Sequence, residues 1–228
     1  MALGETSVNR LPLWLLLQTL CLPSVASGQL YVGAMGGLST LSADARSVIR
    51  SEGASFWLYK PENGATATLF LGRHLTDCLS VQGDYGWSGN DLTLSSTSVS
   101  GQGETVYQEV RTSSQQSVVG NLLLYFRNRH SWVRPYLSVG TGLLRLQSKQ
   151  VAIKALVGAP ALPPQEFSSV AAALRVTVGM DLTLHHGWAF RYTFSETIRA
   201  NPISARLSPP GERNLATFKN LFGIVKTF

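Results

Sequence analysis

Apolar and polar residues alternate with a period of two over much of the chain. The longest run is 169–184, SVAAALRVTVGMDLTL, in which every second residue is apolar and most residues between are small or polar. Segments 188–197 and 78–88 repeat the pattern with aromatic residues on the apolar side. Because successive side chains of a strand point to opposite faces, this alternation predicts β-strands that each carry one apolar and one polar face.

Further segments follow the same pattern less regularly, and the predicted count is eight strands, with ten as the alternative. The additional segments are 29–41, 65–73, 115–127, 133–147 and 217–228. Tight turns are expected near 74–77, 128–132 and 185–187, and long connections near 42–64, 89–114, 148–168 and 199–216. Short turns on one side and long loops on the other are typical of an outer-membrane barrel.

Two barrels of opposite polarity fit these strands. A membrane barrel turns its apolar face outward, whereas a soluble secreted barrel turns it inward around a small apolar ligand. The aromatic face of 188–194 and the terminal Phe228 favour the membrane barrel. Since every backbone polar group needs a partner in lipid, such a sheet must close on itself. The predicted fold class is all-β, an eight-stranded antiparallel up-and-down transmembrane β-barrel, with an interior only wide enough for side chains.

Residues 1–28 have the organisation of a secretory signal peptide. Arg10 ends a short n-region, the apolar segment 11–26 reads LPLWLLLQTLCLPSVA, and small residues occupy positions 26–28. The apolar run is shorter than the roughly 20 residues of a membrane-spanning helix. We therefore expect cleavage before Gln29, a barrel domain at 29–228, and export to the bacterial outer membrane.

Composition narrows the alternatives further. Of the 228 residues, 44% are hydrophobic and 14% are charged, which is too apolar a composition for a disordered chain. Signal cleavage would leave Cys78 as the one cysteine of the mature chain, so no internal disulfide is expected. The net charge of +6 suits an anionic surface such as lipopolysaccharide. Outer-membrane lipid and lipopolysaccharide are the expected partners, and nucleic acid is not.

Three stretches give the chain a family resemblance. They are LYVGAMGG at 30–37, RPYLSVGTG at 134–142, and the C-terminal strand at 217–228, which ends in an aromatic residue. In these stretches the chain resembles the small outer-membrane β-barrel proteins of the OmpA/OmpX type, in the form that has the barrel alone and no peptidoglycan-binding domain. The resemblance implies a structural, adhesive or loop-mediated binding role, and a monomer is the default expectation.

The resemblance also gives the C-terminal strand a role. In the family, the terminal aromatic residue and its alternating apolar partners are read by the barrel-assembly machinery, which is therefore a further expected partner. Phe222, Ile224 and Phe228 match this assembly signal. Lys226 departs from it, since an apolar or aromatic residue is usual at that position, although a lysine side chain can reach water from the membrane interface.

Charged residues on the predicted inner face form the main candidate site. A charge that faces a narrow lumen must be paired or hydrated. We expect Asp84 and Asp181 to pair with Arg127, Arg175 or Arg191 and thereby to plug the barrel. The alternative is a narrow gated pore lined by the same groups.

Enzyme and metal chemistry have little support in the sequence. The chain contains no Walker loop, HExxH or GxSxG motif, and neither Ser195 nor Glu196 has a histidine neighbour. Four histidines lie in or beside the predicted short turns: His74, His130, His185 and His186. Their spacing does not indicate a metal site. We predict no catalytic residue, cofactor or metal; the alternative is a lipid A-modifying barrel enzyme whose nucleophile and base meet across strands.

Aromatic residues of the chain fall into two groups. Those near strand ends or on apolar faces, such as Tyr125, Tyr136 and Trp188, are assigned to the girdles that flank an apolar belt. The cluster FWLY at 56–59, in the first long connection, is interpreted as a strand extension above the membrane or as loop packing, with a ligand-binding patch as the alternative. The expected function is that of an integral outer-membrane protein with a structural or surface-loop interaction role.

Overall fold

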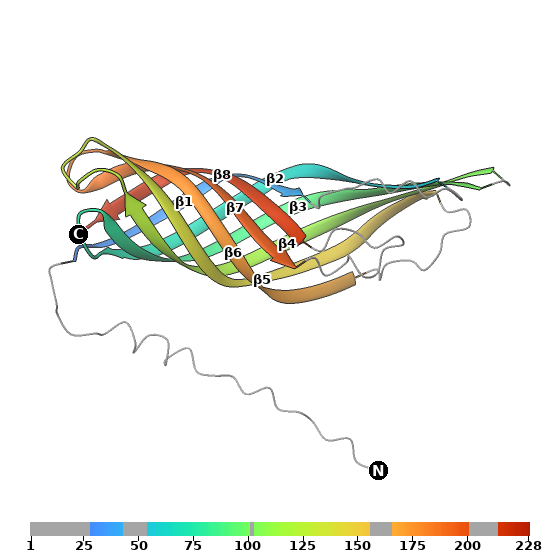
Figure 1. Ribbon diagram of the computed structural model, residues 1–228, viewed down its shortest axis with the longest axis horizontal. Helices are drawn as coiled ribbons and strands as arrows, with labels where there is room; N and C mark the ends of the chain where they lie inside the picture. Colours follow the sequence, from blue (N-terminus) through green and yellow to red (C-terminus); the bar gives the residue numbers. More distant parts are fainter. Residues whose placement is uncertain (1–27, 43–53, 101–102, 156–165, 201–213) are drawn as a thin grey trace, which may run out of the picture.

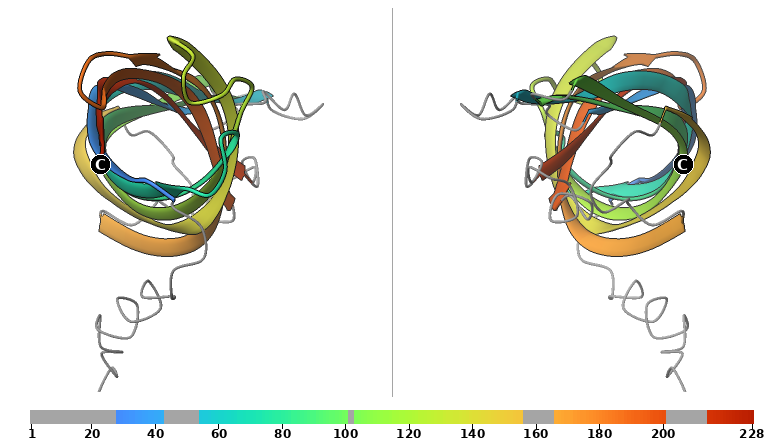
Figure 2. Two further views of the ribbon diagram at one scale, coloured as in Figure 1. Left: turned by 90° about the vertical axis from the view of Figure 1, so that its left-hand side faces the viewer. Right: turned by 90° about the vertical axis from the view of Figure 1, so that its right-hand side faces the viewer.

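The strands close into a single barrel. The computed structural model describes residues 28–42, 54–100, 103–155, 166–200 and 214–228, so residues 1–27 of the predicted signal peptide lie outside the described residues. Eight antiparallel strands pair in chain order, and the last pairs with the first (Figures 1 and 2). The strands are β1 (Leu30–Ser42), β2 (Ala54–His74), β3 (Leu79–Ser100), β4 (Gly103–Tyr125), β5 (Val133–Ala155), β6 (Glu166–Thr183), β7 (Trp188–Ala200) and β8 (Asn214–Thr227). The predicted fold class is confirmed.

The wall of the barrel is apolar outside and mostly polar inside, as the alternation predicts. On β6, Leu174, Val176 and Val178 are exposed on the outer face, whereas Arg175 and Thr177 are buried on the inner face. Because large apolar side chains cover the outside, the barrel has the polarity of a membrane protein and not that of a soluble ligand carrier. Within the described residues, no helix is long and apolar enough to cross a bilayer.

Short turns join the strands at one end of the barrel, where the C-terminus also lies (Figure 1). The β6–β7 turn is closed by the Leu184 amide, which donates to the Trp188 carbonyl at 2.7 Å. Gly187 has a φ of 74° in this turn, and a Cβ there would lie 2.6 Å from the Thr227 carbonyl oxygen. Only glycine avoids both problems. In outer-membrane barrels the short turns lie on the periplasmic side.

At the opposite end, β2 to β5 continue well beyond the wall (Figure 1). β3 and β4 stay paired as far as Ser100 and Gly103, so the long connection predicted at 89–114 is largely strand. The 56–59 cluster lies within β2, which confirms its interpretation as a strand extension. Above a membrane both faces of a sheet can meet water, so the strand does not require the period-two pattern there.

The outer face of two strands shows where the apolar belt ends. Moving away from the short turns, the outward residues change from Val118 to Gln116 on β4. They change from Leu143 to Arg145 on β5. Polar and charged side chains are costly in the hydrocarbon layer. The belt therefore ends near these positions, and the rest of both strands projects above it.

On the inner face, aromatic rings of one strand pack against glycines of the neighbouring strand. Tyr31 is paired with Gly72, and Tyr136 is paired with Gly179. A Cβ on Gly72 would lie 2.2 Å from Cζ of Tyr31, and one on Gly179 would lie 2.5 Å from Cζ of Tyr136. Each ring therefore occupies the space that a side chain would fill, which lets large side chains pack inside a narrow barrel.

Tyr125 and Tyr136 do not belong to an interface girdle, contrary to the sequence prediction. Both are 2% exposed and point into the lumen, with ring centroids 5.2 Å apart. The reason is strand register, because Tyr125 lies two residues from the inward-facing Leu123 and therefore shares its side of β4. Trp188, by contrast, lies on the outer face and is 42% exposed.

Candidate functional site

The candidate site is a chain of buried polar groups inside the barrel. Near its short-turn end, Arg191 and Asp181 form an ion pair, with Nε 2.6 Å from Oδ1 and Nη2 2.7 Å from Oδ2. Arg191 also donates from Nη1 to Oε1 of Gln82 at 2.7 Å and from Nη2 to the Tyr125 hydroxyl at 2.8 Å. The Arg191 side chain is thus buried with several charge-assisted hydrogen bonds, which offset its loss of hydration.

Aromatic rings surround this ion pair. The Arg191 guanidinium carbon lies 4.9 to 5.5 Å from the ring centroids of Phe70, Tyr136 and Tyr31. A second guanidinium, that of Arg134, lies 4.0 Å from the centroid of Tyr125. Rings attract cations through their negative faces, and this attraction grows where water is excluded. The layer therefore combines charge pairing with close packing.

His74 belongs to this layer and not to an exposed turn. It is the last residue of β2, is 4% exposed, and shares a 2.6 Å hydrogen bond between Nδ1 and the Ser80 hydroxyl. Its ring centroid lies 4.6 Å from that of Tyr31. The turn predicted at 74–77 therefore begins one residue later than expected. The inward face of β2 continues as far as His74, the last residue of that strand.

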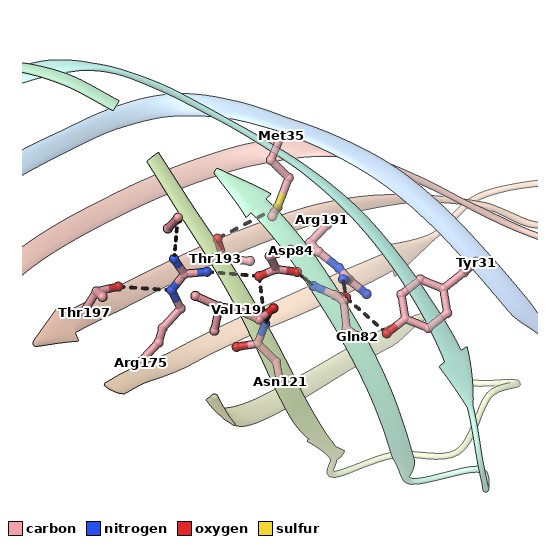
Figure 3. Close-up of polar contacts among 11 residues, drawn as sticks. Tyr31, Met35, Gln82, Asp84, Val119, Asn121, Arg175, Arg191, Thr193 and Thr197 are labelled. Carbon is pink, nitrogen blue, oxygen red and sulfur yellow. Dashed lines mark hydrogen bonds and ion pairs between the residues drawn. The ribbon is translucent and has the colours of Figure 1, made fainter. Parts of the chain in front are cut away.

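A second ion pair lies deeper in the lumen (Figure 3). Nη1 of Arg175 is 3.1 Å from Oδ2 of Asp84, which also accepts from Nδ2 of Asn121 at 2.9 Å. Gln82 connects the two pairs, since its Nε2 donates to Oδ1 of Asp84 at 2.7 Å while its Oε1 accepts from Arg191. Four strands on different sides of the barrel are thereby joined through the lumen.

The structure brings four of the five predicted network residues into two pairs: Asp84 with Arg175, and Asp181 with Arg191. Arg127 is not part of this network. It has the spacing of an inward residue, but β4 ends at Tyr125 and Arg127 is exposed in the turn that follows. Alternation predicts a side chain's direction only while the strand persists.

Sequence reasoning missed several buried cations. Among the described residues that are buried, cations outnumber carboxylates by six to two: Arg111, Arg134, Arg175, Arg191, Arg199 and Lys219 against Asp84 and Asp181. Arg111 and Arg199 lie in segments that were expected to be loops. Lys219 lies within the predicted terminal strand, two residues from the buried Leu221, so its spacing alone could have identified it.

Two cavities lined by described residues differ in size. A pocket of about 200 Å³ at the short-turn end is lined in part by His74, Arg134, Arg191 and Phe228. A smaller cavity of about 20 Å³ lies beside the second ion pair, with Asp84 and Arg175 in its lining. The second has room for about one water-sized particle.

Metal-binding groups were expected to be absent, and only the part of the chain that the structure describes can be compared with that expectation. It holds no group of three or more His, Cys, Asp or Glu residues that could bind a metal ion. His130 is exposed in a turn, and the rings of His185 and His186 are 6.3 Å apart. Ser195 is buried on the inner face whereas Glu196 lies on the outer face, so these two side chains are separated by the barrel wall.

Two residues of the predicted assembly signal, Phe222 and Ile224, lie on the outer face of β8, and Phe228 follows the last residue of that strand. Phe222, Ile224 and Phe228 are 52%, 53% and 72% exposed. Lys226 reaches the turn before β7, where its Nζ donates to the His186 carbonyl and lies 5.3 Å from the Trp188 ring centroid. The lysine that departs from the family pattern is therefore held at the short-turn rim.

Above the apolar belt, exposed side chains also pair across strands. Nζ of Lys149 on β5 lies 2.8 Å from Oε1 of Glu166 on β6. This hydrogen bond and the attraction of the opposite charge raise the pKa of Lys149 and lower that of Glu166. Because both groups are in water, the pair contributes little to stability.

The sequence matches the profile of a known protein family. The sequence profile of the family described as "Outer membrane protein beta-barrel domain" matches residues 13–209. No curated protein matches the sequence. Among solved structures, the chain is similar to Neisserial surface protein A (NspA), with 13% identity, a TM-score of 0.54, and coverage of 87% of this chain and 97% of NspA. This likeness shows a shared fold.

Two further structures have lower scores. One is Ail, the attachment invasion locus protein of Yersinia pestis, in complex with the heparin analogue sucrose octasulfate, with 11% identity, a TM-score of 0.48, and coverage of 89% of this chain and 100% of Ail. The other is OprG from Pseudomonas aeruginosa, with 13% identity, a TM-score of 0.46, and coverage of 87% of this chain and 95% of OprG.

Proposed function

Because the chain belongs to the outer membrane protein beta-barrel domain family, we propose that it is an integral protein of the bacterial outer membrane whose projecting strands interact with partners at the cell surface. The barrel serves as a closed scaffold in this proposal, and the segment 1–28 is a signal peptide that directs export and is cleaved. Lipid and lipopolysaccharide surround the apolar belt, and the barrel-assembly machinery reads the outer face of β8. The protein acts as a monomer and without enzymatic chemistry.

The observation that carries the proposal is the sheet that β2 to β5 form above the apolar belt. β1 leaves the sheet after its pairing of Leu41 with Glu62, yet β2 extends up to Ala54. Over 54–61, β2 pairs with β3 and, among the described residues, with no other strand. Such an edge presents unpaired backbone donors and acceptors to water, and an extended segment of a partner can pair with it.

The buried network supports a scaffold over the alternative of a narrow pore. Two ion pairs joined by Gln82 cross the lumen, and Tyr31, Tyr125 and Tyr136 pack beside them. At eight strands the interior is only wide enough for such side chains. Because filling the lumen rigidifies the wall, it also gives the projecting strands a fixed base.

The part of β3 and β4 that supports the β2 edge can be removed without touching the barrel. Residues 94–109 are replaced by Asn-Gly, which joins Thr93 to its direct partner Val110 in a two-residue hairpin. This deletion also removes the β3 partners of Ala54 to Tyr59. The matched control is Glu166→Gln, which alters the exposed surface and keeps the sheet.

Cells that lack the protein are supplied with wild type, the shortened variant or the control, and all three are first checked for heat-modifiable barrels in the outer membrane. We expect the shortened variant to form a barrel that still resists detergent. Cells that carry it should no longer aggregate and settle, and they should no longer adhere to protein-coated surfaces. Full retention by the shortened variant would contradict a surface-interaction role and leave a structural one. Discrete ion currents from the wild type would overturn the closed scaffold.

A further inference from the structure

Arg134 is a buried cation at the short-turn end, and no carboxylate of the described residues forms an ion pair with it. It lies near the start of β5 and is 6% exposed. Its Nη2 donates to the Asp77 carbonyl at 3.1 Å, and its guanidinium lies over the Tyr125 ring. Its buried Nε has no hydrogen-bond partner in the part of the chain that the structure describes. A buried cation without a counter-charge is costly, so Arg134 favours the binding of an anion beside it.

Arg134 lines the pocket of about 200 Å³ at the short-turn end, together with Arg129 and Arg191. The charge of Arg191 is already balanced, because the Asp181 carboxylate accepts two of its hydrogen bonds. The charge of Arg129 is balanced by Asp77, whose Oδ1 lies 3.2 Å from Nε of Arg129. Of the arginines among the described lining residues, Arg134 alone is left unbalanced, so the pocket has an excess of one positive charge.

The ends of the mature chain do not change this excess. Gln29 and Phe228 also line the pocket. The proposed cleavage before Gln29 would add an α-ammonium group there, and the C-terminal carboxylate of Phe228 adds the opposite charge. His74 is the remaining titratable side chain among the lining residues, and a histidine is mostly neutral at pH 7. One monovalent anion would therefore balance the pocket, whereas a dianion would exceed its charge.

Part of the lining is apolar. Val225, which is 3% exposed, and Ala189 are direct partners on β8 and β7 and both line the pocket. The volume is below the roughly 300–1,000 Å³ of sites for drug-sized ligands, so a smaller molecule is expected. A guanidinium has the planar fork that matches the two oxygens of a carboxylate. Charge, lining and volume together favour a small organic acid over an inorganic ion.

We propose that the pocket at the short-turn end binds a small monocarboxylic acid, with its carboxylate on the Arg134 guanidinium and a short apolar chain against Ala189 and Val225. The carboxylate supplies the negative charge that the pocket lacks. The site lies at the opposite end of the barrel from the projecting sheet, so it is independent of the proposed role at the cell surface.

The test is calorimetric titration of the protein purified from the outer membrane in micelles of an uncharged detergent. Isovalerate is the probe, isovaleramide has nearly the same shape without the charge, and inorganic phosphate has charge without an apolar chain. Chloride is present at one concentration throughout. We expect saturable heat at one site with isovalerate, and about tenfold or more weaker binding of isovaleramide and of phosphate, because each lacks one of the two contacts.

Two variants remove the site by independent means, and one serves as a control. Arg134→Met removes the charge, and Ala189→Leu fills the apolar part of the pocket while Arg134 stays. Both should weaken isovalerate binding about tenfold or more. Arg127→Met removes an exposed arginine of a neighbouring turn that does not line the pocket, and it should bind isovalerate as the wild type does. Each variant is first checked for a heat-modifiable barrel.

Crystals grown with isovalerate locate the ligand directly. Density for its carboxylate is expected against the Arg134 guanidinium in the wild type. The absence of saturable heat, or equal binding of isovalerate and isovaleramide, would overturn the proposal. Isovalerate binding that survives unchanged in both Arg134→Met and Ala189→Leu would overturn it as well. The same holds for a crystal in which the C-terminal carboxylate of Phe228 itself occupies the position beside Arg134.

Discussion

Asp181 and Arg191 are direct partners on the neighbouring strands β6 and β7, and two contacts of 2.6 and 2.7 Å join their charged groups inside the barrel. Both residues are at most 4% exposed. Cross-strand neighbours on one face are held close by the sheet itself, so little side-chain freedom is lost when they pair. The pair therefore fixes the hairpin register and presents Arg191 to Gln82 on the far wall.

Removing one charge of this pair should strongly destabilise the barrel. Asp181→Asn keeps the shape of the side chain but leaves Arg191 buried without its counter-charge, and we expect a loss of about 3–5 kcal/mol. Urea unfolding of the protein folded into lipid vesicles, followed by tryptophan fluorescence, measures the change. Replacing both residues, Asp181→Leu with Arg191→Met, should recover most of the loss. A single variant as stable as wild type would contradict this prediction.

Gly179 should not tolerate a side chain. Its Cβ would lie 2.5 Å from Cζ of Tyr136, so Gly179→Ala forces the ring out of its position, at an expected cost of about 1–3 kcal/mol. Gly83→Ala is the matched control, because nothing lies within 4 Å of a Cβ at that position. Urea midpoints of the two variants provide the comparison, and equal effects would show that the Tyr136 ring adapts freely.

The lumen should stay closed when one of its ion pairs is broken. Arg175→Ala removes the second pair but leaves the layer of Arg191, Tyr31, Tyr125 and Tyr136 beneath it. Planar bilayer recordings should show no discrete current steps for wild type or for this variant. Steps in Arg175→Ala alone would identify the Asp84–Arg175 pair as a gate instead of a structural plug.

The two ends of the barrel should differ in their access to a thiol reagent. Cys78 is exposed near the short turns, whereas Lys149 lies above the apolar belt at the opposite end. In intact cells, a membrane-impermeant maleimide should label Lys149→Cys in a Cys78→Ser background and should leave Cys78 of the wild type unlabelled. Lysis should make Cys78 reactive. Labelling of Cys78 in intact cells would reverse the assigned orientation.

The terminal aromatic residue should contribute more to assembly in the outer membrane than to the folding of the barrel in vitro. The Phe228 amide donates to the Leu30 carbonyl at 2.9 Å, and alanine keeps this backbone bond while removing the exposed ring. Phe228→Ala should lower the amount of heat-modifiable protein in the outer membrane and leave refolding in vitro unchanged. Phe126→Ala, which removes an equally exposed ring elsewhere, is the control and should assemble normally.

The sequence by itself determined the strands and their polarity, because lipid outside and packed groups inside impose a period of two on every residue of the wall. It also identified Asp84, Asp181, Arg175 and Arg191 as inner charges. It did not determine which of them pair, since any inward cation could reach either carboxylate until the register is set. Arg127 shows the same limit, because alternation does not say where a strand ends.

Only the tertiary structure decided the contacts that cross the lumen. Arg191 and Gln82 are 109 residues apart in the chain, yet closure of the barrel brings Nη1 and Oε1 to 2.7 Å. Arg175 and Asp84 are 91 residues apart, and closure brings Nη1 and Oδ2 to 3.1 Å. The sequence likewise did not predict the projecting sheet. Its strands pair through backbone groups, and every residue type carries these groups. The alternation in the sequence indicates which residues face lipid. Closure of the barrel and the register of its strands decide which side chains come into contact.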